Sequence, residues 1–177
     1  MVENSVTIST VGDSGTGADI VFSAKALVQA DPANNESPPP NFAANAGVGA
    51  ITIGAPLGLF DSLGAVTLTG DRVNLGADIY ATGNNVIIQG PTATATQLVL
   101  FGGTNGNGNF DPQINTSCDG CNGGNITIIG SVDATTTGVE TLTLQAGTGE
   151  ISITGDIGAK VPLGGVSLSA NGNNDGG

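Results

Sequence analysis

One apolar pattern occurs twice in residues 124–168, which read GNITIIGSVDATTTGVETLTLQAGTGEISITGDIGAKVPLGGVSL. A shift of 25 positions superimposes apolar residues on apolar residues, placing Ile126 on Ile151, Ile128 on Ile153 and Val132 on Ile157. One register earlier, Leu142 and Leu144 correspond to Val166 and Leu168. An internal echo of about this length is typical of repeat architectures, in which each repeat is one supersecondary unit.

Short alternating segments of the same kind fill the rest of the chain. Each has β-branched residues or Leu at alternate positions, Thr, Ser or Asn between them, and Gly nearby to turn the chain, as expected for strands. There is no sustained apolar pattern of helical period, and Gly or Pro interrupts almost every ten-residue window. We therefore expect an all-β chain with strands at residues 5–8, 50–53, 65–68, 72–75, 125–128, 141–144, 150–153 and 165–168.

A second, longer overlay also appears in the sequence. Residues 51–68 can be laid over 151–168 without a gap, so that apolar positions and glycines coincide along both segments. Ile51 then corresponds to Ile151, and Val66 corresponds to Val166. We interpret both segments as equivalent parts of two repeats.

A unit of roughly 25 residues is too short to enclose its own core, so it must bury its apolar face on neighbouring copies. The sequence predicts a parallel β-helix, or β-solenoid, with roughly 25-residue coils whose strands pair with their equivalents above and below. An antiparallel sandwich also accommodates short strands and frequent turns, but it does not predict the internal echo. The residues expected to face the core are Ile51, Ile53, Val66, Leu68, Ile126, Ile128, Leu142, Leu144, Ile151, Ile153, Val166 and Leu168.

The composition excludes several classes of function. Of 177 residues, 3 are Lys or Arg and 15 are Asp or Glu, which gives a net charge of −12. Nucleic-acid binding requires several basic side chains against the phosphates, and an anionic membrane surface requires them too. No apolar run is long enough to cross a bilayer as a helix. We therefore expect no nucleic-acid partner and no membrane insertion.

Two segments interrupt the repeat and define the expected domain organisation. Residues 31–41 are polar and Pro-rich, and residues 102–124 are rich in Asn and Gly and contain both cysteines. We expect a single solenoid over residues 1–170, as a fragment of a longer repeat array, with these two segments protruding as loops. Residues 171–177 are predicted to form a disordered tail.

The repeats resemble those of giant bacterial exoproteins of the filamentous-haemagglutinin-like adhesin type. The resemblance rests on the spacing of glycines and alternating apolar residues in 124–128, 142–147, 149–158 and 162–168. It covers residues 47–90 and 124–170 well. It implies a right-handed β-helical stalk or adhesive filament that is secreted to the bacterial cell surface. Partners implied by this family are neighbouring repeats or other copies, and surface carbohydrate or other cells.

Catalytic chemistry has little support in the sequence. The chain contains no His, so neither a Ser-His-Asp nor a Cys-His arrangement can be built. Asp71, Asp78, Asp133 and Asp156 lie beside predicted turns, where Asp commonly caps backbone amides. A polysaccharide lyase would need acidic clusters with a basic side chain, whereas Arg72 is isolated, as is Lys160. We expect no enzymatic activity.

Two further motifs are candidate sites. Cys118 and Cys121 form a lone CxxC, which cannot supply four zinc ligands, and we interpret it as a local disulfide. Residues 105–111 place Asn side chains at alternate positions up to Asp111, as calcium loops do, but the bidentate Glu that would complete such a site is missing. We therefore predict no cofactor, with calcium as the one metal that the pattern allows.

The sequence leaves three functions open. The first is a secreted structural or adhesive rod whose loops at 31–41 and 102–124 make contacts. The second is a subunit that stacks end to end into an extracellular filament, because an open coil end exposes unpaired backbone groups. The third is a carbohydrate- or ice-binding face, which requires Thr52, Thr67, Thr127 and Thr143 to align on one flank.

Overall fold

The computed structural model describes residues 5–12, 16–30, 38–102, 111–118 and 122–170. Within these ranges the chain is built of β-strands and one short 3₁₀ turn, η1 (Pro91–Ala93). The strands are β1 (Val6–Ser9), β2 (Ile20–Phe22), β3 (Phe42–Ile53), β4 (Val66–Leu75), β5 (Ile79–Tyr80), β6 (Val86–Gln89), β7 (Thr96–Leu100), β8 (Gln113–Asn115), β9 (Ile126–Ile128), β10 (Gly130–Ala134), β11 (Thr141–Gln145), β12 (Ile151–Ile153) and β13 (Gly165–Ser169). The prediction of an all-β chain is confirmed.

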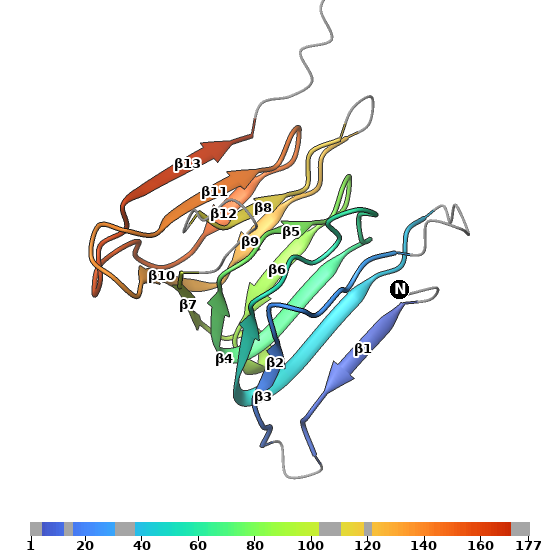
Figure 1. Cartoon of the computed structure of the whole chain (residues 1–177), viewed down its shortest axis with the longest axis horizontal. Coiled ribbons are helices and arrows are strands. Elements are labelled where there is room, and N and C mark those ends of the chain that lie inside the picture. Colours follow the sequence, from blue (N-terminus) through green and yellow to red (C-terminus); the bar gives the residue numbers. More distant parts are fainter. Residues whose placement is uncertain (1–4, 13–15, 31–37, 103–110, 119–121, 171–177) are drawn as a thin grey trace, which may run out of the picture.

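The strands stack on three faces, and every pairing between them is parallel (Figure 1). The first face contains β1, the first half of β3, the first half of β4, β6, β9 and β12 in that order. The second face contains β2, the second halves of β3 and β4, β7 and β10. The third face contains β5, β8, β11 and β13, and single bridges extend it back through Leu57 to Val28.

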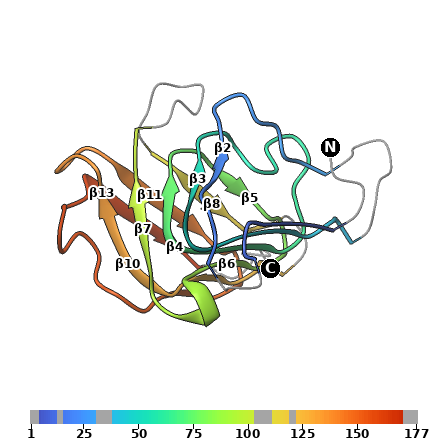
Figure 2. The ribbon, with the colours of Figure 1, turned by 90° about the horizontal axis from the view of Figure 1, so that it is seen from below.

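The chain visits the three faces in turn and then begins again, which makes it a parallel β-solenoid. The six strands of the first face define six coils, numbered here from the N-terminal side. In Figure 1 the colours follow this order along the stack, from blue β1 to red β13. The turns that join the faces lie at the corners of the coils, and η1 projects at one of them (Figure 2, yellow-green).

The 25-residue echo coincides with the register of the last two coils. Ile126 pairs with Ile151 and Ile128 pairs with Ile153 on the first face, and Val132 forms a bridge with Ile157 on the second. On the third face Leu142 pairs with Val166, and Leu144 pairs with Leu168. This part of the sequence interpretation is confirmed residue by residue.

The longer overlay of residues 51–68 on 151–168 is wrong by one face. Ile51 lies on the second face, paired with Ile20 and Val73, whereas Ile151 lies on the first face. The overlay fails because all three faces use the same alternating pattern and the coils differ in length. On the first face the paired residues are 20 positions apart between Val66 and Val86 but 40 apart between Val86 and Ile126.

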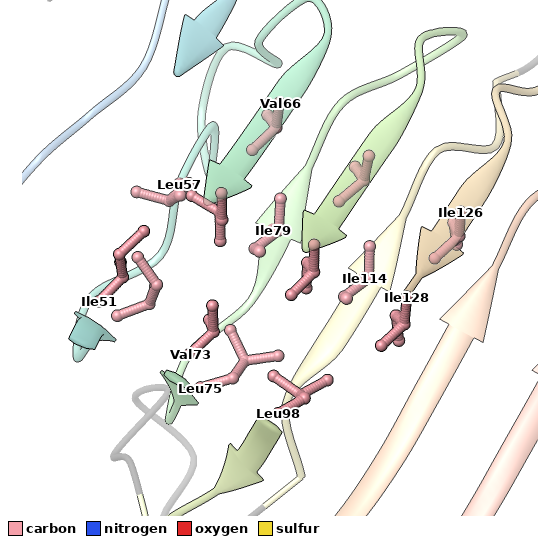
Figure 3. Packing of buried hydrophobic residues seen from close by; sticks show 14 of the residues in the cluster. Ile51, Leu57, Val66, Val73, Leu75, Ile79, Leu98, Ile114, Ile126 and Ile128 are labelled. Carbon is pink, nitrogen blue, oxygen red and sulfur yellow. The ribbon is translucent and has the colours of Figure 1, made fainter. Parts of the chain in front are cut away.

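The core is a continuous aliphatic column inside the coils. Figure 3 shows its side chains from successive coils packed side by side between the ribbons. Eight of the residues predicted to face the core are fully buried, namely Ile51, Ile53, Val66, Leu68, Ile126, Ile128, Leu142 and Leu144. The other four belong to the last coil: Ile151 and Ile153 are half-buried, and Val166 and Leu168 are exposed.

The second predicted loop is partly wrong, because β8 lies inside residues 102–124. Ile114 is fully buried and pairs with Ile79 on one side and Leu144 on the other, so β8 supplies the third face of the fourth coil. A single apolar residue between polar neighbours gave no strand signal amid Asn and Gly. The end of the first predicted loop also belongs to the coils, since Pro40 O accepts a hydrogen bond from Gly64 N at 2.9 Å.

Candidate interaction surfaces

The two motifs weighed as candidate sites fall largely outside the described residues. Cys121 lies outside them, so its disulfide with Cys118 stays a prediction, and so does a calcium site over residues 105–111. The last residue of that motif, Asp111, accepts a hydrogen bond from the Thr141 hydroxyl at 2.6 Å, so its carboxylate joins two coils. Among the described residues no group of three or more Cys, Asp or Glu side chains is arranged to hold a metal ion.

The four threonines of the predicted binding face do not share a flank. Thr67 and Thr127 both face outward on the first face, but Ile87 lies between them in the stack. Thr52 pairs with Val21 and Asn74 on the second face, and Thr143 lies on the third. The condition set for a single flat Thr ladder is therefore not met by these residues.

Two of the four acidic residues predicted to hold backbone amides beside turns, Asp78 and Asp133, do so. Asp78 Oδ1 accepts a hydrogen bond from Gln113 N at 2.9 Å, and Asp133 Oδ1 accepts bonds from the amides of Lys160 at 2.9 Å and Val161 at 3.2 Å. Each bond runs from one coil to the next. These carboxylates therefore act as links between coils.

A regular column of side-chain acceptors, which the sequence analysis missed, runs along the first face. We call it the acceptor column; it lies immediately before the first inward residue in five of the six coils, at Ser5, Asn41, Asn85, Asn125 and Glu150, whereas Ala65 occupies this position in the third coil. The first four of these side chains each accept a hydrogen bond from a backbone amide of the following coil: Asn41 N to Ser5 Oγ (3.1 Å), Ala65 N to Asn41 Oδ1 (2.7 Å), Asn125 N to Asn85 Oδ1 (2.8 Å) and Glu150 N to Asn125 Oδ1 (2.9 Å).

The acceptor column gives the stack a direction. Its side chains always accept from the coil on their C-terminal side. The backbone amide of the next residue donates in that same direction, as from Val6 N to Asn41 O at 2.9 Å and from Ile126 N to Glu150 O at 2.8 Å. Glu150 is the last member, and its side chain is exposed. A sequence signal existed, since Asn directly precedes an apolar-x-apolar strand at Asn41, Asn85 and Asn125.

Two carboxylates are buried near the corner between the second and third faces of the fifth coil. Asp133 and Glu140 are each 2% exposed. Burial alone would raise the pKa of Asp133, but the amides of Lys160 and Val161 hold it below its ordinary value. Burial likewise opposes ionisation of Glu140, and hydrogen bonds from Thr135 Oγ1 and Thr136 N lower its pKa in the same way. Both side chains are thus built into the fold as anions.

Amide side chains form a polar strip on the outside of the third face. Gln145 Oε1 accepts hydrogen bonds from Gln113 Nε2 at 2.7 Å and Asn115 Nδ2 at 3.1 Å. In the adjacent coil the Tyr80 hydroxyl donates to Asp78 Oδ2 at 3.1 Å. Burial, with the neighbouring Asp78 carboxylate, raises the pKa of Tyr80 to about 12. The amides are engaged with one another, so the strip works first as a ladder between coils.

One shallow hollow brings unlike charges together. It has a volume of about 200 Å³ at the start of the second face, and Asp19, Asp71 and Arg72 lie on its wall. Asp19 Oδ1 is already occupied by a hydrogen bond from Ala50 N at 2.8 Å. Arg72, expected to be isolated, lies beside Asp19 and Asp71 on this wall, so that expectation is wrong for Arg72; Lys160 lies in the sixth coil.

The C-terminal end of the stack presents an apolar surface. We call it the end face; it is formed by the sixth coil, where Ile157 is 43%, Val166 40% and Leu168 54% exposed, beside half-buried Ile151, Ile153 and Leu163. At the other end, Ile20 and Phe22 of the first coil are buried, and Ile8 is 37% exposed. Inward-facing residues are thus more exposed in the sixth coil than in the first.

Among the described residues no helix is long and apolar enough to cross a membrane. The chain matches no family model, no curated protein and no solved structure.

Proposed function

We propose that this chain is a structural module: a stiff rod segment of a secreted adhesin on the bacterial cell surface, or of an extracellular filament. The observation that carries the proposal is the continuous column of fully buried aliphatic side chains through the coils (Figure 3). Neighbouring repeats of the same protein are its first partners. In this role the chain catalyses no reaction.

Stiffness follows from the way each coil is held. Parallel backbone hydrogen bonds join every coil to the next along the stack axis, and side-chain bonds such as Asn125 Oδ1 to Glu150 N reinforce them. Bending the rod would stretch these bonds on one flank and open the close-packed interior, which has little free volume. A solenoid of this kind transmits force along its length.

The polar chemistry of the described residues supports a structural role over a catalytic one. The buried acids Asp133 and Glu140 are engaged with backbone amides and hydroxyl groups of the fold itself. Asp78 links β8 to the preceding coil. A general acid or base needs a titrating group that is free to reach a substrate proton, and these carboxylates are engaged in hydrogen bonds within the fold.

Single-molecule force spectroscopy tests the rod. The full chain is held between two well-characterised marker domains and pulled from its ends. We expect a sequence of force peaks, as coils are peeled from the stack, with the sixth coil the first to yield because its core residues are the most exposed. Smooth extension without peaks, like that of an unstructured polymer, would contradict the proposal.

Adhesion is the second part of the proposal and rests on the loops. Because β8 must be kept, the loop-replaced variant exchanges only residues 31–37 and 103–110 for short Gly-Ser turns. Beads coated with the full chain or with the variant are then compared for retention under flow on cultured epithelial cells and on a surface of immobilised glycans. We expect the variant to lose most of the retention; retention equal to that of the full chain would remove the loops from the adhesive role.

A further inference from the structure

The end face is shaped to continue the stack. We infer that it binds a second copy of this chain, whose first coil docks as a seventh coil in head-to-tail orientation. This goes beyond the proposed rod function, because it concerns the molecule that the two ends of the module bind. The rod proposal concerns only the force that the module withstands. Figure 1 shows the two surfaces concerned, with β1 at one end of the stack and β13 at the other.

The register of the proposed contact comes from the coil-to-coil interfaces inside the chain. On the first face, Val6, Phe42, Val66, Val86, Ile126 and Ile151 form one column, and a new first coil would add Val6 of the second copy beyond Ile151. On the second face, by the same rule, Ile20 would lie beside Ile157. On the third face Val28 would lie beside Leu168. Apolar residues meet apolar residues in all three columns.

The acceptor column explains why the second copy docks by its N-terminal end. Within the chain, Ser5, Asn41, Asn85 and Asn125 each accept from the amide of the equivalent residue in the next coil, and Glu150 is the member that faces outward. The equivalent of Glu150 in a docked first coil is Ser5, whose side chain starts the column at the other end. Ser5 N of the second copy would donate to the Glu150 carboxylate, and Ile151 N would donate to Ser5 O.

The opposite arrangement, with two end faces against each other, does not continue this pattern. It would place two outward-facing acceptors of the column in one interface, with Glu150 carboxylates on both sides. Strands of the two copies would also run antiparallel, whereas every pairing inside the chain is parallel. Head-to-tail contacts repeat the same interface and leave a free end at each step, so they build open linear assemblies.

Two variants that each block one end provide the test. Leu168→Lys places a charge on the end face, and Ile8→Lys places one on the docking surface of the first coil; both residues are exposed enough for a lysine to reach solvent in the monomer. Phe60→Lys is the matched control, because Phe60 is an exposed apolar residue of the second coil and belongs to neither the first nor the sixth coil. Sedimentation velocity over a wide concentration range, with electron microscopy of the same samples, measures assembly.

The head-to-tail arrangement makes a distinctive prediction for the mixture. The unaltered chain and Phe60→Lys should form linear particles that lengthen with concentration, whereas each blocked variant alone should remain a monomer. Mixed in equal amounts, the two blocked variants should form a one-to-one dimer and nothing larger. Leu168→Lys keeps an unaltered first coil, and Ile8→Lys keeps an unaltered end face. Glu150→Ala should weaken assembly by about threefold to tenfold, the effect of one lost hydrogen bond.

Several outcomes would overturn the inference. A monomeric unaltered chain at every soluble concentration excludes the contact. Dimers of Ile8→Lys alone, without a mixed dimer when Leu168→Lys is added, would show two end faces in contact. Thermal unfolding followed by circular dichroism checks that each variant is folded. If Leu168→Lys is not folded, Val166→Lys replaces it on the same face.

Force spectroscopy is done on single chains, so a chain that does not stack can still be a rod. Likewise, a chain that extends without force peaks can still stack in the sedimentation experiment.

Discussion

The fifth and sixth coils carry the same apolar pattern and bury it to very different degrees. Leu144 in β11 and Leu168 in β13 are direct partners on the third face, yet Leu144 is fully buried and Leu168 is half exposed. The difference comes from their neighbours: β11 lies between β8 and β13, whereas β13 is the last strand of its sheet. Burial in this fold is therefore a property of the stack, and a coil acquires its core from the coils on both sides.

The largest difference in stability is expected when the same substitution is made at Leu144 and at Leu168. Leu144→Ala should lower the free energy of unfolding by about 3 kcal/mol, because it removes buried methylene groups and leaves a cavity in a packed column. Leu168→Ala should cost less than about 1 kcal/mol, because its side chain already meets solvent. Urea denaturation at concentrations low enough to keep the chain monomeric measures both. Equal costs would mean that the end face is covered.

A glycine at the corner between the first and second faces gives the next test. Gly130 has φ of 139°, and a Cβ there would lie 1.9 Å from Thr96 O of the preceding coil, so Gly130→Ala should destabilise the chain by about 2–3 kcal/mol. Gly155 occupies the equivalent corner in the sixth coil, where the Cβ would lie 2.5 Å from the Gly130 backbone. Gly155→Ala should cost less, because the last coil can move outward.

Gly12→Ala provides the control for this pair, since a Cβ at that position meets nothing within 4 Å. Its free energy of unfolding should match that of the unaltered chain. Thermal melts of the three variants give the order directly. A larger loss at Gly155 than at Gly130 would contradict the view that the sixth coil is the looser of the two.

The sequence predicted the stacking and part of its register, and the limits have physical causes. Neighbouring coils of similar length could be aligned, as Ile126 with Ile151 shows. Ile51 could not be assigned to its face, because an alternating strand looks the same on all three faces and loops of unequal length intervene. The acceptor column was missed because its three Asn members lie at unequal spacings in the sequence, Ser5 and Glu150 differ in type, and Ala65 interrupts it in the third coil. Exposure of Leu168 depends on a neighbour, which no local pattern encodes.

The Asp133 carboxylate of the fifth coil accepts hydrogen bonds from amides of the sixth coil. The attachment of the sixth coil therefore depends on pH. Its folded-state pKa is below the unfolded value of roughly 3.9, so its contribution to stability is present above that value and is lost as pH falls through the folded pKa. Asp133→Asn should cost about 1.5 kcal/mol at pH 7, the scale of a charged hydrogen bond. The difference between variant and unaltered chain should disappear in acid.

Urea denaturation at pH 7 and in steps below pH 4 measures that difference. Hydrogen exchange at the amides of Lys160 and Val161 supplies the local readout, because these two groups donate to the Asp133 carboxylate. Their exchange should accelerate in Asp133→Asn before exchange in β9 changes. A variant whose deficit stays constant down to pH 2 would show that the carboxylate is not ionised in the fold.

The smallest expected effect separates the last two members of the acceptor column. Asn125→Ala removes a hydrogen bond to Glu150 N and should cost about 1 kcal/mol. Glu150→Ala should leave the stability of the monomer unchanged within error, since in this column each side chain serves the coil that follows. Dilute-solution denaturation distinguishes them. A cost at Glu150 as large as that at Asn125 would mean that its carboxylate binds within its own chain, and it would then be unavailable to Ser5 of a second copy.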